Sequence, residues 1–245
     1  MDSKEKFTIK SEIYDIYRPN YSEQFIGFII ENHSLDRLDR VADVGAGTGI
    51  LTNQLLRIGS EIFAVEPNCE MRQIAENKFF NDKNIYVVNG SAEKTSLENN
   101  SIDLVVVAQA FHWFDVDGFK NEFHRISRNN KAILVWNVKN ESQPYLIELE
   151  NVNRKYCESF KGFSGGADKG KIACFFDHKY NEKVFVNNIK VNKDGFLNGV
   201  LTGSYTPNKN DEFYSEYVEK VEGIFHKYCV DDKLTIENDT IAFYN

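Results

Sequence analysis

Short apolar runs alternate with segments of helical spacing through the middle of the chain. The apolar runs lie at 41–44, 61–65, 85–88, 101–107 and 131–138. Between them, apolar residues recur at three- and four-residue intervals at 50–58, at 69–79, and in a helix expected from Asp115 or Asp117 to 128–130. Strands joined by helices cross over with a right hand and therefore pair in parallel. The pattern predicts an α/β fold with a mostly parallel sheet and helices on both faces.

Further elements are expected on both sides of this central region. Ser22 and Glu23 begin an apolar helix near the N-terminus. Later segments predict a helix at 144–160, a flexible loop at 162–166, a strand at 184–191, an amphipathic helix at 211–228 and a strand at 234–243. A chain of 245 residues without a linker or repeat predicts one domain spanning 1–245.

Three glycines at alternate positions, Gly45, Gly47 and Gly49, follow the first apolar run. Glycine has no Cβ and takes positive φ readily, so such a cluster after a strand suits a binding turn at the start of a helix. A dinucleotide fingerprint requires glycine where Ile50 stands, and a phosphate loop requires Lys-Ser/Thr after Gly49. Both phosphate-binding interpretations are weakened, and a tight turn without a ligand is the remaining alternative.

The segment 43–49, Asp-Val-Gly-Ala-Gly-Thr-Gly, resembles motif I of the class I S-adenosylmethionine (SAM)-dependent methyltransferases. The resemblance implies a Rossmann-like seven-stranded sheet with strand order 3-2-1-4-5-7-6. It also implies SAM as cofactor and S-adenosylhomocysteine as product. The residues of this motif expected to contact the cofactor are Asp43, Gly45, Ala46 and Gly47.

An acidic residue, Glu66, ends the second apolar run, 17 residues after Gly49. Nucleoside-binding sheets place a carboxylate there to accept hydrogen bonds from the ribose hydroxyls, and the alternative is an exposed loop glutamate. Pro67 and Asn68 then open a helix. The resemblance adds Pro67 to the cofactor site and places Met71 against the adenine, although Met71 alone would be interpreted as core filler.

Two loops after later strands complete the expected cofactor site. By resemblance, the loop after 85–88 reads the adenine edge through a backbone N–H near Ala92 and the side chain of Glu93. Capping of the following turn by Glu93 is an equal alternative. After the fourth strand, Gln109 and Ala110 are expected to contact the cofactor by the same resemblance.

The segment Phe111-His112-Trp113-Phe114 resembles a His-Trp-Phe segment of the subgroup that includes trans-aconitate methyltransferase-like proteins. There it lies beside the sulfonium and the methyl acceptor. His112 is therefore a candidate catalytic base, and His112 and Trp113 are candidate substrate contacts. A buried aromatic cluster with a hydrogen-bonded core histidine is the competing interpretation.

Other acceptor contacts are expected near the two ends of the chain. Residues 14–21, Tyr-x-x-Tyr-Arg-Pro-x-Tyr, resemble a segment of the same subgroup that folds over the cofactor site, which implies such a role for 1–21. The resemblance makes Tyr14, Tyr17 and Arg18 substrate contacts, whereas half-buried aromatic residues anchoring a terminus are the alternative. Tyr205 belongs to a resembling turn that lines the acceptor pocket. Segments 140–182 and 193–230 are expected to supply the helices and loops of that pocket.

Composition narrows the possible partners. The net charge is −8 and no basic run stands out, which argues against a large nucleic-acid footprint. The N-terminus lacks the apolar core of a signal peptide and no apolar stretch is long enough to span a membrane. Four scattered cysteines have no zinc-ligand spacing, so no metal site and a reducing, cytoplasmic environment are expected. They are Cys69, Cys157, Cys174 and Cys229.

These patterns predict methyl transfer from SAM to a small-molecule acceptor by in-line displacement, with a carboxylate or hydroxyl oxygen as a candidate acceptor. A carboxylate requires no base, whereas a phenol, alcohol or protonated amine would use His112. The alternatives are a SAM-binding protein without turnover and a nucleotide-dependent oxidoreductase. The acceptor and the oligomeric state stay open.

Overall fold

The computed structural model describes residues 20–33, 39–163, 167–203 and 205–245. Their contacts group into two compact units that alternate along the sequence. The sheet unit comprises Asn20–Asn137, Gly166–Val186 and Thr240–Asn245, and the helical unit comprises Val138–Gly165 and Asn187–Asp239. The expectation of a single domain over 1–245 stays a prediction.

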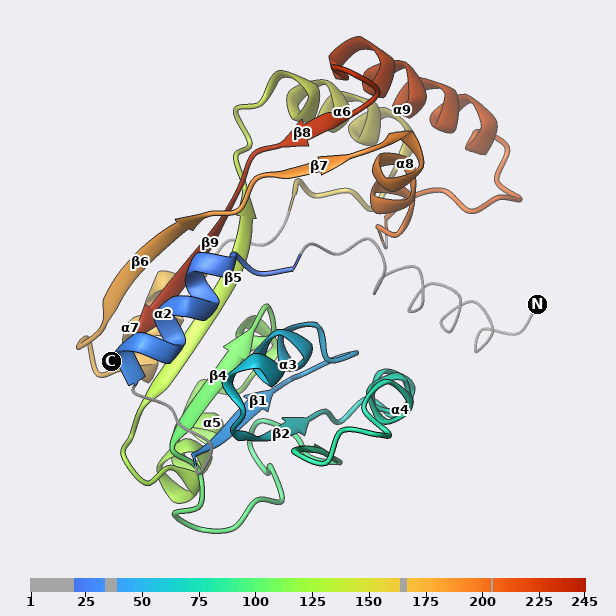
Figure 1. The fold of residues 1–245 in the computed structure, drawn as a ribbon. Helices are drawn as coiled ribbons and strands as arrows, with labels where there is room; N and C mark the ends of the chain where they lie inside the picture. Colours follow the sequence, from blue (N-terminus) through green and yellow to red (C-terminus); the bar gives the residue numbers. More distant parts are fainter. Residues whose placement is uncertain (1–19, 34–38, 164–166, 204) are drawn as a thin grey trace. The chain divides into compact units, whose positions relative to one another are not determined.

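A seven-stranded sheet with the order β3-β2-β1-β4-β5-β9-β6 forms the centre of the sheet unit (Figure 1). The pairs β3–β2, β2–β1, β1–β4 and β4–β5 are parallel. The predicted strand order is confirmed, with β9 in the place of the last strand. The strands are β1 Arg40–Val44, β2 Glu61–Val65, β3 Ile85–Val88, β4 Leu104–Ala108, β5 Ala132–Lys139, β6 Asn181–Val186 and β9 Asn238–Tyr244.

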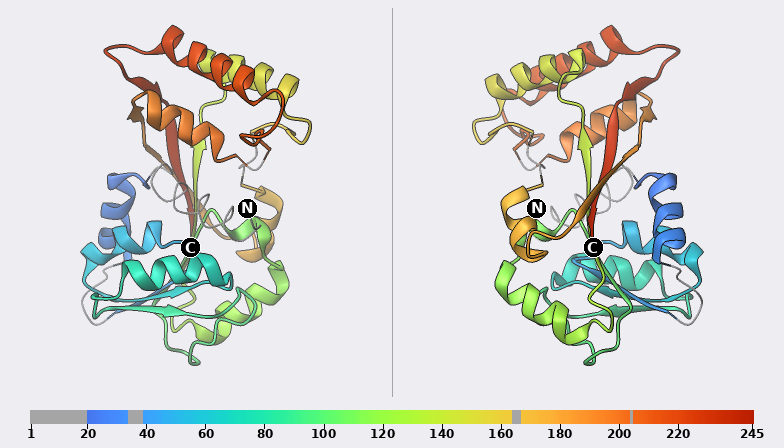
Figure 2. Two further views of the ribbon diagram at one scale, coloured as in Figure 1. Left: turned by 90° about the vertical axis from the view of Figure 1, so that its right-hand side faces the viewer. Right: turned by 90° about the vertical axis from the view of Figure 1, so that its left-hand side faces the viewer.

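Helices cover both faces of this sheet (Figure 2). Because strand side chains alternate between faces, Val41, Leu104 and Ile133 join one core with α2, α3 and α4. Trp136 points the other way, where its ring and those of α5 and α7 surround Phe111. The helices are α2 Glu23–His33, α3 Ile50–Leu55 with the 3-10 turn η1 Leu56–Ile58, α4 Cys69–Lys78, α5 Val116–Ile126 and α7 Lys169–Phe175.

Local sequence signals set the ends of these helices. The Asn68 side chain accepts hydrogen bonds from the N–H groups of Glu70 and Met71, and Asp115 caps α5 through Gly118. Gly59 adopts φ 82° and ends η1. These predicted helix boundaries are confirmed. Helix α5 ends at Ile126 rather than at 128–130, because Ser127 is extended, and the predicted strand at 101–107 begins only at Leu104.

The two late strands predicted at 184–191 and 234–243 are wrong as continuous elements. The first is β6 followed by β7 Ile189–Val191, and the second is β8 Leu234–Ile236 followed by β9. Strands β7 and β8 pair with each other in a separate antiparallel sheet. The break at Glu237 coincides with contacts from Gln143, a residue distant in sequence, whose side chain accepts from Glu237 N at 2.8 Å and donates to Glu237 O at 3.0 Å. Glu237 N is thereby satisfied by a side chain instead of a strand partner, whereas Glu237 O also accepts from Asn140 N, next to β5.

The helical unit has its own core between α6 Pro144–Tyr156, α8 Lys193–Leu201 and α9 Tyr214–Tyr228. Helix α6 ends earlier than predicted because Cys157 is extended, with φ −123°. Helices α7 and α8 were not predicted, although Asp168 and Asn192 cap them as N-cap residues do. No helix among the described residues is long and apolar enough to cross a membrane.

Candidate cofactor and acceptor site

The glycine loop after β1 adopts the left-handed conformation at all three glycines, with φ 75° at Gly45, 59° at Gly47 and 80° at Gly49. A Cβ on Gly45 would lie 2.6 Å from the Ala110 Cβ, and one on Gly49 would lie 2.4 Å from the Phe79 ring. Packing therefore demands glycine at both positions. At Gly47 only the Met71 Sδ, at 3.9 Å, comes within 4 Å among the described residues, so this backbone borders open space.

Glu66, at the end of β2, is buried, with 6% of its surface exposed. Its Oε2 accepts a hydrogen bond from Gly47 N and its Oε1 accepts one from Asn68 N, each at 2.8 Å. The interpretation as an exposed loop glutamate is therefore wrong. Each carboxylate oxygen has more than one lone pair, so both can also accept a bond from a ligand hydroxyl.

Asp43, near the end of β1, is completely buried. Its Oδ2 accepts a hydrogen bond from the Thr52 hydroxyl at 2.6 Å, but its Oδ1 has no partner among the described residues. Burial raises the pKa of Asp43 to about 6. A buried carboxylate oxygen without a partner is costly, and a ligand cation would relieve that cost.

Arg72, on α4, was not anticipated from the sequence. Its Nη1 donates to Glu66 O at 3.0 Å, Pro67 O at 3.1 Å and Asn89 Oδ1 at 3.2 Å. It thereby ties the loop after β2 to the loop after β3. A single arginine in a helix carries no sequence signal for contacts formed by tertiary packing.

The loop after β3 in turn contacts the loop after β4. Glu93 Oε1 accepts a hydrogen bond from Asp115 N at 3.1 Å, and its methylene groups lie against Gly118. Ala92 is buried in the turn closed by the backbone bonds between Ser91 and Lys94. Glu93 therefore bonds the start of α5 as well as its own turn, where, against the opposing effect of burial, its own backbone N–H and the Ser91 side chain also lower its pKa. Its role toward adenine stays a prediction.

The loop after β4 begins with Gln109, a non-glycine residue at φ 57°. Its N–H donates to Val135 O at 2.9 Å and its side chain donates to Asn137 O at 3.1 Å, so β5 holds it in this unfavourable conformation. Such strain is typical of functional turns. It places Ala110 directly against Gly45.

His112 and Trp113, in the 3-10 turn η2 Phe111–Trp113, are exposed to solvent, Trp113 by 82%. The interpretation of His112 as a core histidine is therefore wrong, and Phe111 is the buried member of the segment. The two exposed rings lie 4.8 Å apart. Lys171 of α7, a further residue that the sequence did not indicate, has its Nζ 3.5 Å from His112 O.

Part of the chain is similar to known proteins. Residues 42–135 match the family model described as a methyltransferase domain. An uncharacterized methyltransferase of Schizosaccharomyces pombe is 33% identical over 152 residues, which are 60% of this chain and 59% of that protein. One of Mycobacterium bovis is 34% identical over 140 residues, 57% of this chain and 55% of that protein. The chain thus spans less than two thirds of either relative.

A solved structure of a candidate type II methyltransferase from Anaeromyxobacter dehalogenans shares the fold. Its TM-score is 0.63 at 17% identity, and the match covers 93% of this chain and 97% of that one. The chain therefore contains a region similar to a methyltransferase domain, at 42–135, within the fold of a solved methyltransferase structure. The narrower resemblance to trans-aconitate methyltransferase-like proteins stays a prediction.

The donor and acceptor groups of this site fit SAM, the cofactor that the resemblance at 43–49 implies. The unpaired Oδ1 of Asp43 suits an ammonium group, and the buried Glu66 suits two vicinal hydroxyls. The bare backbone at Gly47, with the Met71 thioether beside it, leaves room for a ligand to approach. The individual cofactor contacts remain predictions that this geometry supports.

Three of the expected acceptor contacts lie outside the described residues, namely Tyr14, Tyr17 and Arg18. The same is true of most of the expected N-terminal cover at 1–21. Tyr21 is buried, and its N–H donates to Gln54 Oε1 at 2.8 Å. Tyr205 belongs to the helical unit, where its ring packs against Phe160. Its role in acceptor binding stays a prediction.

Proposed function

We propose that this chain transfers the methyl group of SAM to a small-molecule acceptor by in-line displacement. SAM supplies a methyl group on a sulfonium, and the electron pair of the broken S–C bond stays on the resulting neutral thioether. The observation that carries the proposal is the contact between the loops that end β1, β2, β3 and β4. These contacts run from Gly47 to Glu66, from Gly45 to Ala110 and from Glu93 to Asp115.

Different residues of the sheet unit bind different parts of SAM. Asp43 accepts from the ammonium group, Glu66 accepts from the ribose hydroxyls, and Met71 with Ala92 borders the adenine. Because a thioether leaves without protonation, alignment and exclusion of water are the main contributions of the protein. The match of residues 42–135 to a methyltransferase domain favours this proposal over a nucleotide-dependent oxidoreductase.

The acceptor side is formed by His112 and Trp113. An acceptor with a carboxylate oxygen attacks without losing a proton, and nearby cations such as Lys171 would orient it. A hydroxyl acceptor gives its proton to His112, whose exposed ring can release it to solvent. Oxygen acceptors of these two kinds are the ones we propose.

Calorimetric titration with SAM, S-adenosylhomocysteine and NAD tests the cofactor assignment. We expect saturable one-to-one binding of both sulfur nucleosides and no heat with NAD. Release of labelled methyl groups to a panel of carboxylates and phenols then tests turnover. Binding of NAD alone would overturn the assignment, and SAM binding without transfer to any acceptor would make the chain a binding protein.

His112→Ala is expected to lower kcat for a hydroxyl acceptor by about 10²-fold or more, because the general base is lost. The same variant should retain SAM affinity and most of its activity toward a carboxylate. His124→Ala is the matched control, since His124 is also exposed. It lies in the last turn of α5, where its Nδ1 is 2.9 Å from Asn130 Oδ1. A His112 variant that lost only SAM binding would assign this residue to the cofactor instead.

A further inference from the structure

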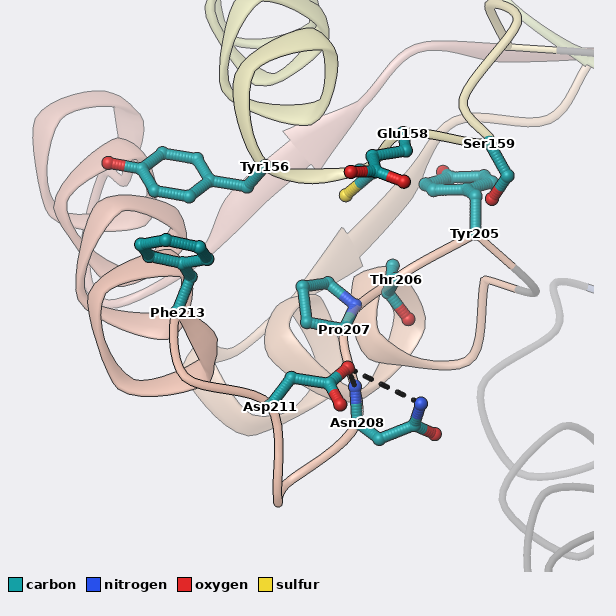
Figure 3. Close-up of a pocket in the computed structure, with 10 residues that line it drawn as sticks. Tyr156, Glu158, Ser159, Tyr205, Thr206, Pro207, Asn208, Asp211 and Phe213 are labelled. Carbon is teal, nitrogen blue, oxygen red and sulfur yellow. Dashed lines mark hydrogen bonds between the residues drawn. The ribbon is translucent and has the colours of Figure 1, made fainter.

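The helical unit contains a cavity of about 380 Å³, lined in part by Tyr205, that the proposed roles of His112 and Trp113 do not involve. It lies between residues 156–159, at the end of α6 and just after it, and residues 205–208 with Asp211 and Phe213, which precede α9 (Figure 3). Its volume is in the range of small-molecule sites. All of its lining residues belong to the one unit.

Two carboxylates border this cavity. Glu158 is exposed and has no hydrogen bond or ion pair with any described residue. Asp211 accepts hydrogen bonds from Asn208 N at 2.6 Å and Asn208 Nδ2 at 3.4 Å, both through Oδ2. No lysine, arginine or histidine is among the described residues that line the cavity, so these two charges are not balanced within it.

Aromatic rings form the sides. In Figure 3 the Tyr156 and Phe213 rings lie beside each other at one end, with Tyr205 at the other and the Glu158 carboxylate between. Phe213 is 55% exposed, so much of its surface is open to a ligand. Lys155 Nζ donates to the Tyr156 hydroxyl at 2.7 Å and lies 4.5 Å from the centre of that ring, so one cation already contacts this side chain.

The inner wall is polar but uncharged. Burial raises the pKa of the Cys157 thiol and raises that of Tyr205 to about 12, so both are protonated at neutral pH. Behind them, Asn153 is completely buried and accepts from the Tyr217 hydroxyl at 2.8 Å. Its Nδ2 has no partner among the described residues. This wall offers neither a thiolate nucleophile nor a positive charge.

We propose that this cavity binds a small organic cation. The ammonium group lies between Glu158 and Asp211, and the apolar part of the ligand packs on Tyr156 and Phe213. Carboxylates without a cationic partner in the cavity lining attract the charge, and electron-rich ring faces stabilise it further. An anionic ligand would meet two like charges, and a neutral one would leave both carboxylate charges unbalanced. The proposal goes beyond methyl transfer and does not depend on it.

Titration of the full chain with phenethylammonium, followed by ¹H–¹⁵N NMR, tests the proposal. We expect saturable shifts at the amides of 157–159 and 205–213. The uncharged 2-phenylethanol and the anionic phenylacetate, which have similar shape, should bind at least tenfold more weakly. Raising the salt concentration should weaken the binding of the cation, because the carboxylates are exposed.

Variants identify the groups responsible. Glu158→Gln and Asp211→Asn are each expected to weaken binding of the cation at least tenfold, and Asn at 211 can still accept from Asn208 N. Glu212→Gln, an exposed neighbour that does not line the cavity, is the matched control and should bind normally. Equal binding of 2-phenylethanol, shifts elsewhere only, or unchanged affinity in Glu158→Gln would overturn the proposal. SAM titration of the same variants should be normal, which separates this failure from failure of the methyltransferase assignment.

Discussion

Glu66→Ala is expected to weaken SAM binding by about 100-fold or more, measured by calorimetry. Hydrogen bonds to a charged group contribute about 1.5–3 kcal/mol each, and each tenfold change in affinity corresponds to about 1.4 kcal/mol. The substitution removes the acceptor for both ribose hydroxyls. It also leaves Gly47 N and Asn68 N without their partner, so the glycine loop loses one of its contacts with the end of β2 and keeps those of Gly45 N and Ala46 N with Val65 O.

Two further variants separate charge from loop geometry. Glu66→Gln keeps one acceptor oxygen but turns an NH₂ group toward one of the two backbone N–H donors, so we expect affinity only partly recovered. Glu70→Ala is the control, since Glu70 lies one turn away in α4 and has no contact with the glycine loop among the described residues. Unchanged SAM affinity in Glu66→Ala would refute its assignment to the ribose.

The parallel core could be predicted because its determinants are local. Each strand of the central region is a short apolar run, and Asn68, Asp115 and Gly59 mark helix ends through contacts within one turn. The strand order of the sheet followed from the resemblance at 43–49. Periodicity and turn chemistry therefore sufficed wherever a residue interacts with its sequence neighbours.

The late strands could not be predicted because distant residues decide where they break. Gln143 bonds both backbone groups of Glu237, where the strands break, and nothing in the local sequence of 234–243 signals this. Similarly, the spacing suggested that all three glycines are required but did not show the physical reason at each position. Contacts with Ala110 and Phe79 exclude a side chain at Gly45 and Gly49, whereas Gly47 alone borders open space.

The candidate site was likewise predictable in its residues but not in their environments. The pattern could not decide whether Glu66 and His112 were buried or exposed, and the structure reverses the simple alternative in both cases. Arg72 and Lys171 reach the site from helices, with no motif to identify them. Burial and unpaired polar atoms are properties of the folded chain, so they are the information that a structure adds.

Asp43 is expected to make the stability of the ligand-free protein fall as pH rises from about 4 to about 6. Burial raises its pKa from 3.8 to about 6, so the unfolded chain releases this proton at lower pH than the folded one. The stabilising contribution of Asp43 to the free energy of unfolding is therefore complete below about pH 4 and lost above about pH 6. A shift of this size corresponds to about 3 kcal/mol, and urea unfolding of wild type against Asp43→Asn across this interval isolates it.

The affinity for SAM should depend on pH in the opposite direction. An ammonium group at the unpaired Oδ1 stabilises the charged carboxylate, so bound SAM lowers the pKa of Asp43 and binding releases a proton at pH values below about 6. Affinity should then fall as pH drops below 6, and calorimetry in buffers of different ionisation enthalpy should detect the released proton. Asp43→Asn should bind SAM weakly at every pH, without this proton release. If wild type and Asp43→Asn showed the same pH profile, Asp43 would be a structural residue rather than the partner of the ammonium group.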